Sequence, residues 1–151
     1  LAVDSELEDK LRSNPDLIDN FIEEGLRYEA PVGGLFRMAK EDTQVNDIEI
    51  KAGDHLWVIY AAANRDPAIF DNPDDFLVDR ENAREHLAFG HGEHYCIGAL
   101  LARKEARIAI QLLLANIENI QLVKDKNKYE YEESFVLRGL KELHVSYDVI
   151  S

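Results

Sequence analysis

The ten residues from 89 to 98, Phe-Gly-His-Gly-Glu-His-Tyr-Cys-Ile-Gly, restrict the possible folds of this chain more than any other segment. They contain its single cysteine, Cys96, and three glycines at positions 90, 92 and 98. Gly90 and Gly92 permit positive φ and a tight turn, and Gly98 leaves room beside the sulfur for a bulky group. A long helix is expected to begin at about Cys96, where the helix dipole favours the thiolate. Soft and borderline metals prefer such a ligand.

Three other interpretations of Cys96 follow from the residues alone. Lone cysteines are commonly inert buried thiols, although the glycine spacing argues against that here. Zinc is an alternative because His91, His94 and Cys96 are potential ligands, and His91-Gly92-Glu93 matches the H-x-E of zinc deaminases. The second cysteine that such a site needs is missing from the sequence. A cysteine protease requires a base that a third group orients, and nothing in the sequence points to one.

The composition fits one globular domain in a reducing compartment. The 151 residues suffice for a sizeable core, and 17 Lys and Arg against 30 Asp and Glu give a net charge of -13, which argues against nucleic acid as a partner. A single cysteine forms no internal disulfide, so we expect a cytoplasmic protein. No apolar run has the length of a membrane span, and the start, LAVDSELEDK, does not resemble a signal peptide. The chain starts without a methionine, and we expect a front portion to be missing.

Apolar spacing predicts two helices before residue 31. Residues 4–12 form a short polar helix, and Pro15 begins a second helix for which Asn14 is the expected cap. The second helix ends before Pro31, because a residue that precedes proline resists helical geometry. Its apolar face repeats at spacings of three and four and consists of Leu17, Ile18, Phe21, Ile22 and Leu26.

The rest of the chain predicts a mixed fold, α+β and mostly helical. Strands at 35–39, 45–50 and 55–61 form a small antiparallel sheet, and residues 64–88 form a long ordered meander rich in Asp, Asn and Pro. A helix over about 97–117 is apolar around most of its circumference and is expected to be buried. The tail reads as a C-terminal β-hairpin in which residues 135–137 pair with residues 143–147.

The cysteine segment resembles the haem-binding loop of the cytochrome P450 superfamily. The pattern F-x-x-G-x-H-x-C-x-G-x-x-L-A matches residues 89–102 at every fixed position. The resemblance implies that haem b (iron protoporphyrin IX) is the cofactor, that Cys96 is the axial thiolate ligand of its iron, and that His94 hydrogen-bonds a haem propionate. The implied cofactor-binding residues are Cys96, His94, Arg37, Phe89, Gly90, Gly92, Gly98 and Ala102.

Further residues acquire roles from the same resemblance. Glu24 and Arg27 match the family's E-x-x-R, and Arg80 stands where a meander arginine completes a structural network with them. Taken alone, the Glu24–Arg27 spacing is also that of an ordinary surface pair. Arg37 matches a strand arginine that reaches a haem propionate, although it also suits an exposed strand. The substrate-contact candidates, which as loop residues also suit plain packing, are Val32, Gly33, Gly34, Leu35, Val136 and Leu137.

The resemblance covers only the C-terminal portion of the family fold, as a single unit over residues 1–151. Family members activate oxygen with an acid-alcohol pair on a long helix, and the one threonine here, Thr43, lies in an expected turn outside any such helix. The implied activity of the complete protein is that of a monooxygenase, which inserts one oxygen atom of O₂ into a small organic substrate. We do not expect the 151 residues alone to be competent. The alternative is a non-catalytic P450-like module that binds haem or lacks it.

Partners follow from the same interpretation. The sequence has no flavin or nicotinamide fingerprint, so electrons must come from a ferredoxin-like or flavin donor. Arg103, Lys104 and Arg107 form a basic cluster where an acidic donor could dock by electrostatic steering. The alternative is that they form local pairs with Glu105 or the meander. An uncovered apolar face would also favour a homodimer or a separate N-terminal fragment as partner.

Overall fold

The computed structural model describes residues 1–150 and begins with two helices on either side of a short turn. Helix α1 (Ser5–Ser13) is capped by Asp4, whose side chain accepts a hydrogen bond from the Leu7 amide. A 3-10 turn (Pro15–Leu17) leads into α2 (Ile18–Tyr28), so both predicted helices are confirmed. The predicted cap at Asn14 is wrong, because this residue closes α1 through its own amide and makes no side-chain cap.

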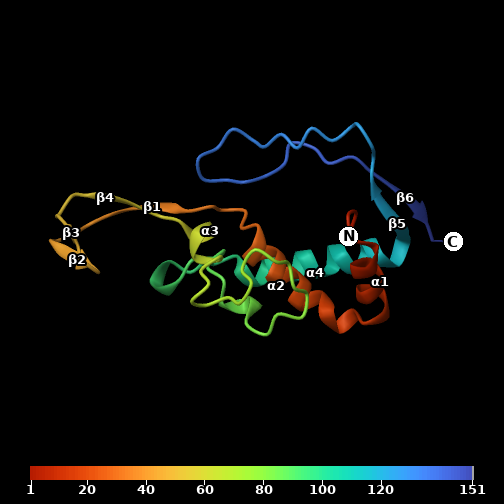
Figure 1. Cartoon of the computed structure of the whole chain (residues 1–151), viewed down its shortest axis with the longest axis horizontal. Coiled ribbons are helices and arrows are strands. Elements are labelled where there is room, and N and C mark those ends of the chain that lie inside the picture. Colours follow the sequence, from red (N-terminus) through yellow and green to blue (C-terminus); the bar gives the residue numbers. More distant parts are fainter. Residues whose placement is uncertain (151) are drawn as a thin grey trace.

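Two antiparallel ladders form the predicted small sheet region at one end of the molecule (Figure 1). Strand β1 (Leu35–Met38) pairs with β4 (His55–Val58), and β2 (Thr43–Val45) pairs with β3 (Ile48–Ile50). The predicted single strand at 45–50 is therefore wrong, because Asn46 adopts φ 51° and turns the chain into a hairpin. Thr43 begins β2 and does not lie in the expected turn.

Helix α3 (Tyr60–Ala63) follows β4, so the third predicted strand ends earlier than residue 61. The segment after α3 is an irregular meander with one 3-10 turn (Ala83–Glu85), as predicted. Asn20 of α2 donates hydrogen bonds to the carbonyls of Val78 and Arg80, and this contact fixes the meander against α2.

Helix α4 (Ala99–Asn116) continues directly into β5 (Ile117–Leu122), which pairs antiparallel with β6 (Val145–Val149). The predicted pairing of residues 135–137 with 143–147 is wrong. Because β5 leaves α4 beside the end of the chain, it takes β6 as its partner, while Leu137 pairs with Val32 instead. The tail thus crosses the molecule and contacts the loop that follows α2 (Figure 1).

The apolar core lies where α1, α2, the meander and the C-terminal half of α4 meet. Its buried members are Leu11, Ile18, Val78 and Leu114. The expectation that α4 is buried is wrong for most of its length, since Leu100 is 83% and Leu101 is 61% exposed. Helix α2 packs against α4 from one side (Figure 1), whereas the apolar side chains of Leu100, Leu101, Ile108 and Leu112 on α4 are exposed. None of the helices in residues 1–150 has the length and apolar character of a membrane span.

The close contact of Gly34, which directly precedes β1, with β4 gives a testable prediction. A Cβ at this position would lie 2.5 Å from Trp57 Nε1 and 2.6 Å from the Val58 carbonyl oxygen. Gly34→Ala is therefore expected to lower the free energy of unfolding by about 1–3 kcal/mol in urea titrations. Gly139→Ala is the control, because nothing lies within 4 Å of its Cβ position. Equal stability of the two variants would contradict this packing.

Candidate functional site

Two glycines with positive φ shape the loop that carries Cys96. Gly90 has φ 71° and Gly92 has φ 72°, a region that residues with a Cβ rarely adopt. The Cys96 amide donates to the Phe89 carbonyl at 2.9 Å and closes the loop. Helix α4 begins at Ala99, three residues later than the sequence led us to expect. Cys96 is exposed, so the interpretation as an inert buried thiol is wrong.

Cys96 lies in the wall of a largely apolar cavity of about 340 Å³. The cavity is formed by the end of α2, the loop before β1, α3 and the cysteine loop. Tyr60 of α3, which no sequence pattern singled out, is one of its lining residues and is 6% exposed. The lining residues are Leu26, Pro31, Val32, Leu35, Tyr60, Ala88, Phe89, Gly90, His94 and Cys96.

Two side chains suited to an anionic group are associated with this cavity, one in its lining and one in contact with a lining residue. His94 is one of its lining residues, and Arg37 of β1 donates to the Tyr60 hydroxyl at 3.4 Å. Within residues 1–150 neither Arg37 nor His94 forms an ion pair with a carboxylate. The site therefore combines an accessible thiol, apolar walls and two basic side chains that no carboxylate neutralises.

The structure brings only some of the sequence-predicted residues to this cavity. Arg37, Gly92, Gly98 and Ala102 do not line it, although Arg37 contacts the lining residue Tyr60, and a Cβ at Gly98 would lie 3.8 Å from Cys96 Sγ. The glycine therefore keeps one flank of the sulfur open.

The substrate-contact candidates divide between two cavities. Val32 and Leu35 line the cavity of Cys96, whereas Gly33, Val136 and Leu137 line another of about 300 Å³. The Gly33 amide donates to the Val136 carbonyl at 2.9 Å, so the loop after α2 and the tail do meet. Gly34 lines neither cavity and is buried against β4.

Glu24, Arg27 and Arg80 form one buried cluster. Arg27 Nε donates to Glu24 Oε2 at 2.7 Å, and its Nη2 donates to Oε1 at 2.8 Å. Arg80 Nε lies 3.1 Å from both oxygens, and the Leu77 amide donates to Oε1 at 2.9 Å. The relative exposures are 0% for Glu24, 1% for Arg27 and 6% for Arg80. Burial alone would raise the pKa of Glu24, but these hydrogen bonds outweigh it and lower the pKa.

The two arginines fix the meander through its main chain. Arg27 donates to the carbonyls of Asn64, Pro73 and Asp75, at 3.0, 2.7 and 2.9 Å. The buried side chain of Asn64 then accepts from the Leu87 amide at 2.6 Å, and the Leu87 carbonyl accepts from the Gly90 amide at 2.8 Å. An unbroken line of contacts thus joins the cluster to the cysteine loop.

A second buried cluster, which the sequence analysis missed, surrounds Glu23. Arg103 Nε donates to Glu23 Oε1 at 2.6 Å and Arg103 Nη2 to Oε2 at 2.9 Å, while His86 Nε2 lies 3.1 Å from Oε2. Burial would raise the pKa of Glu23, but hydrogen bonds from His86 and Arg103 lower it to about 2. The only sequence signal was an acid beside the Glu24 of E-x-x-R, and adjacent helical residues point in different directions.

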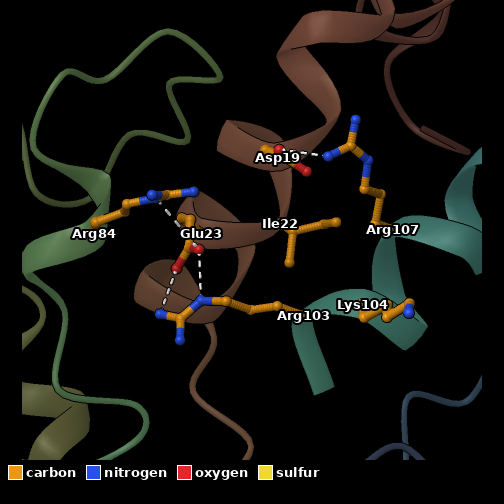
Figure 2. A pocket seen from close by; sticks show the side chains of 7 residues that line it. All are labelled: Asp19, Ile22, Glu23, Arg84, Arg103, Lys104 and Arg107. Atoms are coloured by element: carbon orange, nitrogen blue, oxygen red, sulfur yellow. Dashed lines mark hydrogen bonds and ion pairs between the residues drawn. The ribbon is translucent and has the colours of Figure 1, made fainter. Parts of the chain in front are cut away.

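The predicted basic cluster is therefore not one uniform surface (Figure 2). Arg103 is committed to Glu23, and Arg107 pairs with Asp19 at 2.9 Å. Lys104 forms no ion pair within the described part of the chain. The expected local pairs with Glu105 are not formed, because α2 supplies the acids. The group lines a shallow cavity of about 220 Å³ together with Ile22 and Arg84 (Figure 2).

The zinc alternative lacks the geometry that it needs. A structural or catalytic zinc ion takes at least three protein ligands. Among residues 1–150 no group of three or more His, Cys, Asp or Glu side chains is arranged to hold a metal ion. His91 and His94 therefore do not complete a zinc site with Cys96.

Known proteins match both the sequence and the fold. The family model described as Cytochrome P450 matches residues 2–144. The biotin biosynthesis cytochrome P450 of Bacillus subtilis (strain 168) is 44% identical over 139 residues, which are 92% of this chain and 34% of that protein. The chain thus spans about a third of the length of this relative.

Solved structures give the same result. Substrate-free CYP150A6 of Mycobacterium marinum superposes with a TM-score of 0.93 and 40% identity over 97% of this chain and 37% of that one. P450BioI in complex with hexadec-9Z-enoic acid ligated acyl carrier protein gives a TM-score of 0.91 and 42% identity, over 98% of this chain and 38% of that one.

Arg80→Gln tests the cluster around Glu24. Loss of one buried partner is expected to lower the free energy of unfolding by about 3–5 kcal/mol, because charge and meander carbonyls are left unpaired. Arg107→Gln is the matched control, since it removes an ion pair whose two side chains are 48% and 43% exposed, and is expected to change stability by about 1 kcal/mol or less. Chemical denaturation measures both, and equal losses would refute the structural role of Arg80.

Proposed function

The chain belongs to the cytochrome P450 family, and on this basis we propose that Cys96 is the axial thiolate ligand of a haem iron. The cofactor of this family is haem b, which its members hold through a cysteine thiolate. The observation that carries the proposal is the position of Cys96, exposed in the wall of an apolar cavity and presented by a loop with two positive-φ glycines.

The residues around Cys96 fit this cofactor. A porphyrin needs apolar walls, and the cavity supplies them from α2, α3 and the cysteine loop. The haem propionates need cationic or hydrogen-bonding partners, and we assign this part to His94 and Arg37. Gly98 keeps the flank of the sulfur free of a side chain. When bound, thiolate-ligated haem supplies reductive activation of O₂.

For the complete protein we propose a monooxygenase that inserts one oxygen atom into a small organic substrate. In this proposal residues 1–151 are its C-terminal haem-thiolate portion, and the acid-alcohol pair belongs to the remainder. The exposed apolar side chains just before and within the first turn of α4 support a covering partner, since Ile97 is fully exposed and Leu100 is 83% exposed. Val32 and Leu35 are the proposed substrate contacts, because they line the same cavity as Cys96.

We further propose that an acidic electron donor docks beside the shallow cavity of Figure 2. Lys104, Arg107 and Arg84 supply its positive charge, on a chain whose net charge is -13. Arg107 and Arg84 also pair with carboxylates, those of Asp19 and Glu23, but both arginine side chains are largely exposed, at 48% and 69%. Arg103 is left out of this surface because its side chain is only 25% exposed and is bound to the buried carboxylate of Glu23. Opposite charges steer two proteins into contact and raise their rate of association.

Cys96→Ser tests the thiolate assignment. In the full-length protein, reduced and exposed to carbon monoxide, the variant is expected to lose the red-shifted Soret band of a thiolate-ligated carbonyl complex. His91→Ala is the control, because His91 is exposed and does not line the cavity. A serine variant with unchanged haem content and an unchanged band would refute the role of Cys96. A wild-type protein that folds but never shows the band would favour the non-catalytic alternative.

Charge reversal tests the donor surface. The double variant Lys104→Glu with Arg107→Glu is expected to slow electron transfer from an acidic ferredoxin at low salt, and the difference should shrink at high salt as charges are screened. Lys51→Glu is the control, because Lys51 directly follows β3 in the region of the two β-ladders, away from the proposed docking surface on α4 (Figure 1). Stopped-flow reduction measures the rates. Equal rates for the two variants at every salt concentration would remove the docking proposal.

A further inference from the structure

The geometry around α4 points to Arg103 as a positioning residue for the cysteine loop. We propose that its guanidinium holds Phe89 and Tyr95, which lie on either side of the loop, and fastens both to the buried carboxylate of Glu23. This contact would set the position in which Cys96 presents its sulfur. The inference rests on the proposed role of Cys96 as haem ligand, and it concerns a residue that does not line the cavity of Cys96.

Arg103 uses all three nitrogen atoms and one face of its guanidinium in this arrangement. Its Nε and Nη2 atoms form a fork with Glu23 at 2.6 and 2.9 Å. Its Nη1 donates to the Tyr95 hydroxyl at 2.9 Å, and its central carbon lies 4.6 Å from the centroid of the Phe89 ring. A lysine has one point charge and cannot make these contacts together. The position therefore calls for arginine specifically.

Both residues that Arg103 holds are coupled to Cys96 through the main chain. The Phe89 carbonyl accepts the hydrogen bond of the Cys96 amide at 2.9 Å, so displacement of Phe89 displaces the cysteine. Tyr95 directly precedes Cys96, and its ring meets the Phe89 ring edge-on with centroids 6.3 Å apart. The loop has only the 3-10 turn at 92–94 as regular structure of its own, so outside contacts determine its conformation.

Glu23 gives Arg103 a rigid foundation. It is 2% exposed and lies on α2, which packs against α4. Its Oε2 atom also contacts His86 Nε2 at 3.1 Å, and His86 Nδ1 accepts a hydrogen bond from the Ala88 amide at 3.1 Å. Since Nδ1 is an acceptor, Nε2 carries the hydrogen and donates it to Glu23. Glu23 therefore holds both Arg103 and the segment around His86 that precedes the cysteine loop.

The pairing also decides the charge beside the loop. Glu23 neutralises Arg103, whose guanidinium lies over the Phe89 ring (Figure 2 shows the ion pair). Without this carboxylate, an uncompensated positive charge would remain against Phe89 and Tyr95 of the cysteine loop. Such a charge favours the reduced iron, which carries one more electron, and shifts the reduction potential to more positive values. If Arg103 and Glu23 served packing alone, their substitution would not predict the direction in which the reduction potential shifts.

The test uses the full-length haem protein and four variants. Arg103→Gln is expected to raise the ratio of the unshifted to the red-shifted carbonyl Soret band roughly tenfold or more, because it removes the fork of two charge-assisted hydrogen bonds to Glu23. Arg103→Lys should resemble it, because lysine lacks the fork. Glu23→Gln should shift the reduction potential to more positive values, and the double variant Glu23→Gln with Arg103→Gln should shift it back.

Arg65→Gln is the matched control. Arg65 also pairs with a carboxylate, that of Asp74, and lies over an aromatic ring, that of Tyr28 at 4.3 Å, but away from the cysteine loop. It is expected to keep the wild-type band ratio and potential. If Arg103→Gln fails to fold, Arg103→Lys gives the same measurement.

The outcomes separate this inference from the assignment of Cys96. A wild-type protein without the red-shifted band refutes the proposed function. A wild-type protein with the band, together with Arg103 variants that keep its ratio and potential, overturns the positioning role alone. Equal effects of Arg103→Gln and Arg65→Gln overturn it as well, because any stacked ion pair would then do the same.

Discussion

Arg27 and Arg80 share the carboxylate of Glu24, and the meander depends on this arrangement for its shape. An irregular segment leaves main-chain carbonyls without the partners that a helix or strand would give them. The two guanidinium groups fill that gap, because each has donors left over after the ion pair and directs them at carbonyls between residues 64 and 75. The buried carboxylate of Glu24 is therefore neutralised by the two arginines, and both of its oxygens accept hydrogen bonds. Removal of any member strands the others.

Helix α2 serves two loops because Glu23 and Glu24 are neighbours. Successive residues of an α-helix point about 100° apart, so the two acids face different parts of the molecule. Glu24 faces the meander, while Glu23 faces α4 and the residues before the cysteine loop. Asn64 joins the two sides, since it touches Arg27 through its carbonyl and Leu87 through its side chain. One turn of helix thus holds both the meander and the residues that lead into the cysteine loop.

The sequence predicted the elements that depend on neighbouring residues, but not the contacts between residues far apart in the chain. The helices α1, α2 and α4, the meander and the tight turns around Cys96 follow from spacing, proline and glycine. The partner of β6 does not, because strand pairing depends on where α4 ends in space. Glu23 and Asn64 were missed for the same reason, as their partners lie 80 and 23 residues away. Asn46 was overlooked because a positive φ was expected only of glycine.

The expected burial of α4 also failed, and its failure is informative. Apolar residues around a whole helix mean that every side is to be covered. Here the C-terminal half meets α1 and α2, whereas Leu100, Leu101, Ile108 and Leu112 remain 46–83% exposed. Each Å² of such surface left in water forgoes about 25 cal/mol. Arg103 and Glu23 therefore fix α4 on the side that faces α2. The apolar residues on its exposed side indicate a covering surface that residues 1–150 do not supply.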